Sequence, residues 1–569
     1  MIANTCKRLS FIMMLLGSSY AFTASAVTRF VNIAQTDDLG DGLSWGTASK
    51  QLQTALANSA VGDAIWVAEG VYYPDEGTGQ TDDDRASTFT LKDGVSIYGG
   101  FQGHESALAE RDSDPLSHVS ILSGDVAQDD MNMDGNLIAE TTDAIQGGNA
   151  YRVVSGIGPI VTATLDDLTI TAGHSNESGG GLYNYFFSSP TVTNCSFLGN
   201  FATAHGGASL NFFNSRPTFT ACRFSGNFAG SRGGAVFSSF SSVTTFTDCQ
   251  FTGNTASSSG GALCCVNSSS VTIVGCTVSN NAAPLAGGGA IEQSGHAVLA
   301  STFEENGGGG MIMQSSLGSV SSSSFVKNIG DGLRNEGHSF SVISDSTFSK
   351  NSGIGLYQEQ GSIVRSEIHD NGGDGLVIEG DGYTLTGFNI SGNQGRGCVV
   401  TGNAVNVSNS NFSGNAVDGA VFNGDSIEIM SCSFSGNGTS GASAPGQSVI
   451  TRDSSFTDNI GAGAWLAGEV RNCLFAGNRS GLSLSGSGSI SNCLIMGSNQ
   501  GSGVTIWSGG TITNCTIFGN VSGRDGGGMT LQGGASVINC AIVGNRAPNT
   551  GGGIRSNNTG NSITNCIVW

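Results

Sequence analysis

The chain repeats one short phrase along most of its length: a Cys or another small residue, a spacer, an apolar residue, two spacers and an Asn. One early copy consists of Cys195, Phe197 and Asn200, and the corresponding Phe residues of the next copies follow at intervals of 27 residues. Later in the chain the interval falls to 22, as between Phe412 and Phe434. A fixed period in the range of about 20–50 residues is typical of a solenoid. We therefore expect each phrase to belong to one coil, with loops of variable length between the phrases.

Within each unit the pattern is that of short strands. Thr191, Thr193 and Cys195 alternate with Val192 and Asn194, and Gly and Asn turn residues follow. No unit contains a long apolar segment with the helical period of 3.6. The sequence therefore predicts an all-β fold, a parallel β-helix whose coils stack at about 4.8 Å. About seventeen phrases run from Cys195 to Cys566, which predicts a rod on the order of 80 Å long.

Two residue ladders explain the repeated letters. Stacked Asn side chains can hydrogen-bond to one another and to turn backbone, and Asn tolerates the left-handed conformation of such corners. In the second ladder, Gly permits a sharp bend and Ala fits a tight core. The expected Asn ladder includes Asn200, Asn227, Asn254, Asn306, Asn328 and Asn351. The expected Gly-Gly-Ala ladder starts at Gly206, Gly233, Gly260 and Gly288.

Most of the 14 Cys residues share one slot of the repeat, and other coils place Ser there, as at Ser301 and Ser454. Exchange with Ser indicates a small inward residue, so a stack of buried thiols is the first interpretation. Neighbouring coils hold such Cα atoms about 5 Å apart, within reach of a disulfide, and a few bridges remain an alternative. Cys264 and Cys265 lie outside this slot without a CxxC or His partner, which argues against zinc.

The first 26 residues read as a secretory signal peptide. They combine Lys7 and Arg8, an apolar stretch and the small-residue exit Ala24-Ser25-Ala26. The stretch is too short to span a membrane and no later run of 18 apolar residues exists, so we expect a secreted or cell-surface protein without a transmembrane segment. The net charge is −22, and removal of the signal makes it −24, which disfavours nucleic acid as a partner.

The sequence predicts three parts: the signal peptide 1–26, an N-terminal cap with irregular first coils over 27–150, and β-helix repeats over 151–569. In the cap, Leu52, Ala55 and Leu56 share a helical face with Ser44 as N-cap, which predicts a helix that covers the open end of the solenoid. Because the chain stops within a repeat phrase at Trp569, we expect it to be a fragment. The strands expected in the cap region are 64–68, 88–91, 95–98, 119–122 and 152–154.

These residues carry a family resemblance. The segments Gly40–Trp45, Gly62–Gly70 and Tyr98–Phe101 resemble the N-terminal region of secreted bacterial right-handed parallel β-helix repeat proteins. The F-x-G-N and G-G-A phrases resemble the repeats of polymorphic outer-membrane proteins, which are surface-exposed and include adhesins. The resemblance implies a right-handed β-helix at the cell surface or outer membrane. Members of such families range from adhesins to polysaccharide-degrading enzymes, so it leaves function open.

One acidic column stands out in the central coils. Alignment on the Gly-Leu steps at 332, 355 and 375 places Glu336, Glu359 and Glu379 three residues after each Leu. Stacked coils hold such carboxylates about 5 Å apart, a spacing that suits a retaining glycosidase pair or a calcium site. Asp331 and Asp374 precede two of these steps and are candidate calcium ligands. The other interpretation is a solvated outer face, and no Arg/Lys pair of the kind a lyase needs accompanies the acids.

Two functions follow from these patterns. The first is a non-catalytic rod, adhesin-like, that binds a polysaccharide or a surface or matrix protein, requires no cofactor and has calcium as its one candidate ion. The alternative is a polysaccharide lyase or glycoside hydrolase that uses Glu336, Glu359 and Glu379. Aromatic residues recur at equivalent coil positions and are either core or a platform for sugars or partners. They are Tyr183, Tyr185, Phe186, Phe187, Phe212 and Phe213.

Overall fold

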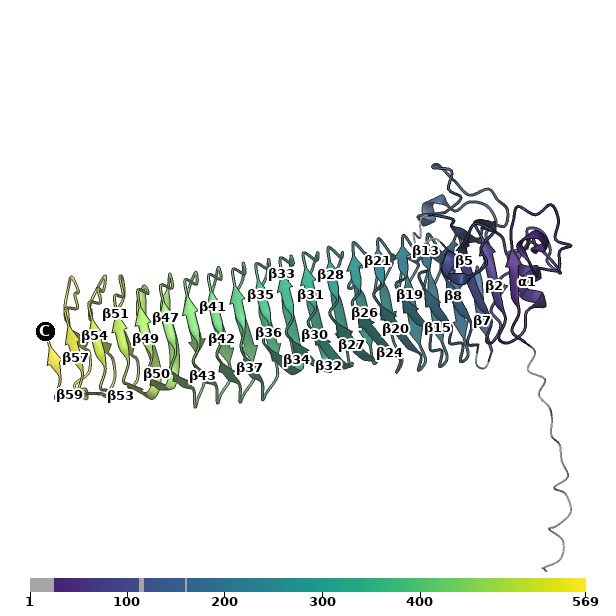
Figure 1. The fold of residues 1–569 in the computed structure, drawn as a ribbon. Helices are drawn as coiled ribbons and strands as arrows, with labels where there is room; N and C mark the ends of the chain where they lie inside the picture. The colour runs from purple at the N-terminus through teal and green to yellow at the C-terminus, as the bar shows by residue number, and fades with distance from the viewer. Residues whose placement is uncertain (1–24, 112–116, 159–160) are drawn as a thin grey trace, which may run out of the picture.

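The protein is a single long stack of β-coils in the computed structural model, which describes residues 25–111, 117–158 and 161–569. The expected signal peptide lies almost wholly outside the described residues. Figure 1 shows the rod, with the purple N-terminal cap at one end and the yellow C-terminal coils at the other. The predicted all-β parallel solenoid is confirmed by the parallel pairing of strands from coil to coil.

A typical coil contributes three short strands, although in some coils the first two merge into one long strand, as in β32 (Leu333–Ser344). The strands β11 (Leu182–Tyr185), β12 (Thr191–Thr193) and β13 (Ser196–Leu198) follow one another along the chain. Each pairs in parallel with the strand 27 residues later, so that Leu182 lies beside Ser209 and Phe197 beside Phe224. Because side chains alternate along a strand, every second residue of each coil points into the rod.

The core is a stack of like side chains. The rings of Phe197, Phe224 and Phe251 stack with centroid separations of 4.9 and 4.7 Å, and all three are buried. The same spacing recurs from Phe412 to Phe434, at 4.8 Å. These distances match the separation of neighbouring strands in a sheet. The coil repeat therefore sets the aromatic stacking, and each Phe fills the space above the one before it.

The expected Asn ladder is present at the corner after each of these strands. Asn328 Nδ2 donates to Asn351 Oδ1 at 2.9 Å, and Asn351 Nδ2 donates to Asn371 Oδ1 at 2.9 Å. Each Asn side chain also hydrogen-bonds to the backbone. For example, Asn351 Oδ1 accepts the Asn328 N–H at 3.0 Å. These side chains are almost fully buried, so the ladder satisfies corner groups that no strand partner reaches.

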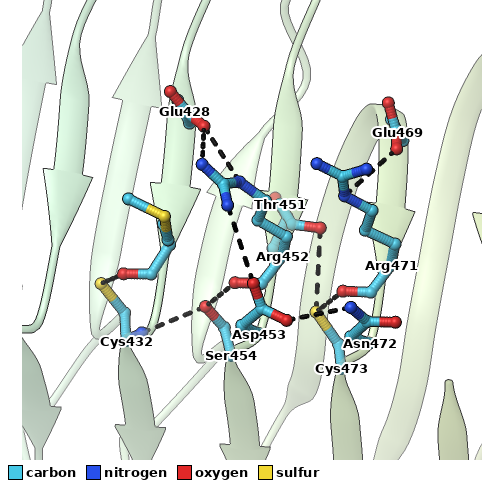
Figure 2. A network of polar contacts seen from close by, with 11 residues as sticks. Glu428, Cys432, Thr451, Arg452, Asp453, Ser454, Glu469, Arg471, Asn472 and Cys473 are labelled. Carbon is cyan, nitrogen blue, oxygen red and sulfur yellow. Dashed lines mark hydrogen bonds and ion pairs between the residues drawn. The ribbon is translucent and has the colours of Figure 1, made fainter. Parts of the chain in front are cut away.

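The Cys slot forms a second ladder, at the corner before the same strands. Figure 2 shows Cys432, Ser454 and Cys473 in this slot on neighbouring coils. The Cys432 N–H donates to Ser454 Oγ at 3.1 Å, and the Cys473 thiol donates to the Thr451 carbonyl at 3.8 Å. In the described chain every Cys is a free thiol, all buried except the half-buried Cys566. The interpretation as a stack of small inward residues is confirmed.

The sequence predicts the cap helix between Trp45 and Gly62, and the α-helix observed there is shorter. The α-helix α1 spans Leu52–Asn58, and its N-cap is Gln51, which makes no side-chain cap hydrogen bond. Ser44 instead caps a separate 3₁₀-helix, η1 (Trp45–Thr47), where its Oγ accepts the Thr47 N–H at 3.2 Å. The assignment of Ser44 as N-cap of the α-helix was therefore wrong, because the chain turns between the two helices. The helix buries Leu52, Ala55 and Leu56 against the first strands.

Four of the five predicted ranges overlap an observed strand by two residues or more, whereas 152–154 shares only Val154 with β7 (Val154–Ile157). The first strands belong to the same ladders as the later coils, with β1 paired to β2, β2 to β5 and β5 to β8. Longer loops separate them than in the repeats. Their bounds are β1 (Thr28–Val31), β2 (Ala64–Ala68), β3 (Gly70–Tyr72), β4 (Phe89–Thr90), β5 (Ser96–Phe101), β6 (Ser120–Ser123), β7 (Val154–Ile157), β8 (Thr164–Asp166) and β9 (Thr169–Thr171).

The Gly-Gly-Ala ladder holds for three coils and shifts in the fourth. Gly206, Gly233 and Gly260 have φ of 63°, 65° and 63°, the left-handed conformation that favours glycine. In the fourth coil Leu263 pairs with Gly289, so Gly288 takes the Ala slot. The alignment that began at Gly288 was wrong by two residues, because the run of three Gly residues fits two registers and only the strand pairing decides between them.

A second hydrophobic cluster lies outside the solenoid wall. Leu210, Phe237 and Cys264 point outward from successive strands yet are at most 4% exposed. The loops that precede the Gly bends fold over them, and the His205 ring stacks on Phe237 at 4.3 Å. A four-stranded ladder of two-residue strands widens these same coils: β10 (His174–Ser175), β14 (Phe201–Ala202), β18 (Phe228–Ala229) and β22 (Thr255–Ala256).

Candidate functional site

The acidic column lies on the outer side of one ladder of strands, at one register position. Glu292 pairs with Gln314 and Gln314 with Glu336. The pairing of the residues before them carries this register on to Glu359 and Glu379. Five successive strands carry the column: β26 (Gly289–Glu292), β29 (Met311–Gln314), β32 (Leu333–Ser344), β34 (Leu356–Val364) and β36 (Leu376–Glu379).

Glu336 is held by hydrogen bonds from two neighbours. Gln314 Nε2 donates to its Oε1 at 2.8 Å, and Arg334 Nε donates to its Oε2 at 2.5 Å. The same guanidinium reaches Asp331 Oδ2 at 3.2 Å. Partial burial opposes ionisation, but the hydrogen bonds from Gln314 and Arg334 outweigh it and hold the pKa of Glu336 below its usual value. Glu336 is therefore a carboxylate at neutral pH and does not suit the role of general acid.

Glu359 and Glu379 share a phenol. Tyr357 donates its hydroxyl to Glu359 Oε1 at 3.3 Å, and the His338 N–H donates to Glu359 Oε2 at 3.1 Å. Burial raises the pKa of Tyr357, and the hydrogen bond and negative charge of Glu379, with the charge of Glu359, add to the effect. The Arg334 guanidinium lies over the Tyr357 ring at 4.1 Å. Hydrogen bonds and one cation thus offset the repulsion within the column.

Sequence reasoning missed two members of the column, Glu292 and Gln314, and the arginine that pairs with the first of them. Glu292 binds Arg232 at 3.0 Å, an ion pair between residues 60 positions apart. Glu292 was missed because its coil lacks the Gly-Leu step used for alignment, and Gln314 because only acids were sought. An open groove of about 510 Å³ runs along the column, lined by Glu292, Gln293, Gln314, Ser315, Glu336, Gly337 and Glu359.

The structure does not bring Asp331 and Asp374 together. They occupy one register position two coils apart, with Ile354 between them. Asp331 Oδ1 accepts the Ile354 N–H at 2.8 Å, and Asp374 Oδ1 accepts the Arg396 N–H at 2.6 Å. Each carboxylate caps the backbone of the following coil and has an arginine beside it. These two residues lack the shared geometry that a calcium site needs.

The aromatic residues form a partly exposed cluster at the same edge of the same ladder, two to four coils before Glu292. Tyr185 stacks on Phe212 at 6.2 Å, and Phe240, which the sequence reasoning did not include, contacts both Phe212 and Phe213 at 4.8 and 4.9 Å. Phe240 is 44% exposed and Phe187 43%. Tyr183 and Phe212 thus pack against the outward hydrophobic cluster, whereas Phe187 and Phe240 present their rings to solvent.

A second open groove, of about 780 Å³, follows the Cys ladder along another corner of the rod. Asn389, Asn411, Asp453 and Asn472 line it together with ladder residues such as Ser454. Asn472 Nδ2 donates to Asp453 Oδ1 at 3.0 Å, and these contacts appear in Figure 2. The groove offers amide and hydroxyl groups but no exposed aromatic ring. Sequence reasoning did not identify this groove.

Comparison with known proteins identifies the family to which the chain belongs. Residues 123–278 and 352–495, more than half of the chain, match the family described as right handed beta helix region. The chain belongs to this family of right-handed β-helix proteins. A segment, residues 218–387, also matches the periplasmic copper-binding protein family NosD. No curated protein matches.

Solved structures share the fold only distantly. A rhamnogalacturonan lyase aligns with a TM-score of 0.33 and 10% identity over 63% of this chain and 82% of its own. The periplasmic alginate epimerase AlgG aligns with a TM-score of 0.23 and 9% identity, over 68% of this chain and 76% of its own. PfbA, a surface adhesin of Streptococcus pneumoniae, aligns with a TM-score of 0.20 and 10% identity, over 82% of this chain and 90% of its own. Likenesses this weak do not bear on function.

The residues of the NosD-like segment do not fit a copper site. Within the described chain, groups of three His, Cys, Asp or Glu side chains close enough to share an ion occur at two places, both before residue 131. The thiols of residues 218–387 are buried in the solenoid wall and hydrogen-bonded to backbone where they occupy the ladder.

None of the helices in the described ranges is long and apolar enough to cross a membrane.

Proposed function

We propose that this protein is an exported, non-catalytic β-helix rod that binds a neutral polysaccharide along one edge of its solenoid, at the cell surface or outside the cell. The proposal deepens the adhesin-like interpretation of the sequence, in which a repetitive face makes many weak contacts with one long ligand. Surface exposure is also what the resemblance of its repeats to polymorphic outer-membrane proteins implies.

One observation carries the proposal: the partly exposed aromatic cluster and the acidic column share one edge of one strand ladder. Ring faces such as those of Tyr185 and Phe240 stack on apolar sugar faces, and carboxylates such as Glu359 accept hydrogen bonds from sugar hydroxyls. From Tyr185 to Glu379 the edge covers eight coil steps, about 40 Å at strand spacing.

Charge selects the class of polysaccharide. The mature chain has a net charge of −24, and Glu379 at the end of the column is exposed with no cation beside it among the described residues. An acidic polymer would bring further negative charge to this edge and be repelled at low ionic strength. A neutral polymer supplies hydroxyl donors without that cost. We therefore expect neutral glycans to bind better than uronate polymers.

A glycoside hydrolase is the second candidate, and the Tyr357 contact favours it. Glu359 and Glu379 lie on neighbouring coils, and coil spacing of about 5 Å is the carboxylate separation of retaining enzymes. The Tyr357 hydroxyl donates to Glu359, and the neighbouring Glu379 helps to raise the pKa of Tyr357, so this phenol is suited to position a proton between the two acids. In this alternative Glu359 and Glu379 are nucleophile and acid, and Glu336 stays ionised beside Arg334.

The test measures retention and product release together. The purified mature chain is passed over immobilised neutral and acidic polysaccharides, and reducing or unsaturated ends are followed in the eluate. Phe240→Ala should weaken retention at least fivefold, whereas Phe518→Ala, which removes an equally exposed ring (49%) from another face, should not. Release of products that is lost in Glu359→Gln would establish the hydrolase. Equal retention of wild type and Phe240→Ala would overturn the binding edge.

A further inference from the structure

Three acids of the N-terminal cap converge in the loop between β3 and β4. Asp75, Asp82 and Asp83 each place one carboxylate oxygen so that the three atoms lie within 4.8 Å of one another. Asp82 and Asp83 are exposed, whereas Asp75 is only 3% exposed. The cluster is separate from the acidic column, which begins more than 200 residues later in the chain.

Asp75 has a buried oxygen without a partner. Its Oδ2 accepts the Asp83 N–H at 2.9 Å, but its Oδ1 is enclosed and receives no hydrogen bond. A buried polar atom of this kind is costly, and for a carboxylate the cost is largest when the group is ionised. Native proteins leave few such atoms, and an unseen ion is one of their ordinary explanations.

No side-chain cation of the described residues forms an ion pair with these acids. Arg85 follows them in the sequence but turns away. Its Nε donates to the Asn149 carbonyl at 2.7 Å and its guanidinium lies over the Tyr151 ring at 4.6 Å. Burial, together with the charges of Glu76 and Asp82, raises the pKa of Asp75. The cluster thus has negative charge in excess of its positive neighbours.

The loop that carries the acids is held in place before any ligand arrives. Gln53 of α1 donates its Nε2 to the Pro74 carbonyl at 2.6 Å. The Gln80 N–H donates to the Gly77 carbonyl at 3.2 Å. Asp83 has φ of 60°, a left-handed turn that directs its N–H back to Asp75. The site is therefore largely preformed, which reduces the entropy cost of binding.

We propose that Asp75, Asp82 and Asp83 bind a calcium ion that fastens this loop to the first coils. Hard cations take carboxylate oxygens, and Ca²⁺ accepts six to eight ligands in flexible geometry, with water completing the shell. Two exposed carboxylates leave room for that water, and Asp75 adds an oxygen of a buried carboxylate whose Oδ1 has no hydrogen-bond partner. Mg²⁺ demands a tighter octahedron and gives up its water reluctantly, so Ca²⁺ is preferred.

Calcium titration calorimetry on the full mature chain tests the assignment. Wild type should bind Ca²⁺ in a saturable step and Mg²⁺ at least tenfold more weakly. Asp75→Asn and Asp82→Asn should each weaken calcium binding at least tenfold. Asp84→Asn removes the same charge from the same loop but lies outside the cluster, and it should bind within twofold of wild type.

Two further measurements keep the test decisive. Asp82 is exposed, so Asp82→Asn answers the question if Asp75→Asn fails to fold. The neighbouring cluster Asp125, Asp129 and Asp130 is the competing location. Loss of binding in Asp130→Asn but not in Asp82→Asn would overturn the assignment, as would the absence of saturable calcium binding by wild type. Limited proteolysis within residues 76–84 should slow at least threefold when Ca²⁺ is added.

Discussion

A histidine inside the rod gives a pH dependence that can be worked out from the structure. His296, in β27 (Gly295–Leu299), is 5% exposed and faces inward. A Cβ at Gly318 in the next coil would lie 2.7 Å from its ring, so this Gly leaves the space that the imidazole fills. Beyond Gly318, His296 Nε2 lies 3.2 Å from Ser341 Oγ, and its Nδ1 has no partner.

Burial lowers the pKa of His296 from 6.5 to about 4. The unfolded chain therefore takes up a proton near pH 6.5 that the folded coil accepts only near pH 4. Stability from the neutral imidazole is complete above pH 6.5 and is lost as the pH falls through this window. Each pH unit between the two pKa values corresponds to about 1.36 kcal/mol, so the free energy of unfolding falls by about 3 kcal/mol by pH 4.

The assay is chemical unfolding at several values between pH 7.5 and 4, with hydrogen exchange of peptides that contain β27 as a local readout. His296→Leu removes the titrating group while keeping an apolar side chain of similar size, so the difference between the two proteins isolates the histidine from the many carboxylates. The free energy of unfolding of wild type should fall by about 3 kcal/mol more than that of the variant over this pH range. Equal pH profiles for the two proteins would refute the reasoning.

Three other predictions follow from the packing of the coils. Asn351→Ala leaves buried corner groups without partners and should cost about 2–4 kcal/mol in unfolding free energy, whereas Asn389→Ala on the outer face should cost less than about 0.5 kcal/mol. Burial raises the pKa of Cys265 to about 12, so it should resist alkylation in the folded protein and react on unfolding, as mass spectrometry would show; rapid labelling of the folded chain would contradict its burial. A Cβ at Gly234 would overlap backbone oxygens of neighbouring coils, so Gly234→Ala should lower the thermal midpoint by several degrees while Gly46→Ala changes it little.

The repeat phrase was sufficient to predict the solenoid, because the Asn and Cys slots need identical neighbours and therefore recur in the sequence. The acidic column was found only where a Gly-Leu step marked the register. Glu292 was hidden because its coil changes that step, and its partner Arg232 lies 60 residues away in sequence.

The outward cluster around Phe237 also escaped sequence reasoning. A period of two assigns Phe237 to the solvent face, and the loops that bury it carry no apolar pattern of their own. The fourth Gly bend was misplaced for a related reason, since a run of Gly has no side chain to fix its register. Features set by loop packing and by long-range pairing were thus beyond what local pattern could predict.

The dependence of glycan affinity on chain length tests the binding edge most directly. A neutral polysaccharide that binds it is cut into fragments of increasing length, and the affinity of each fragment for the mature chain is measured. An extended edge of about 40 Å predicts that affinity rises steadily until the fragment spans it and then levels off. Short fragments that bind as tightly as the polymer would contradict an extended site, and absence of binding to every neutral glycan tested would contradict the proposed function itself.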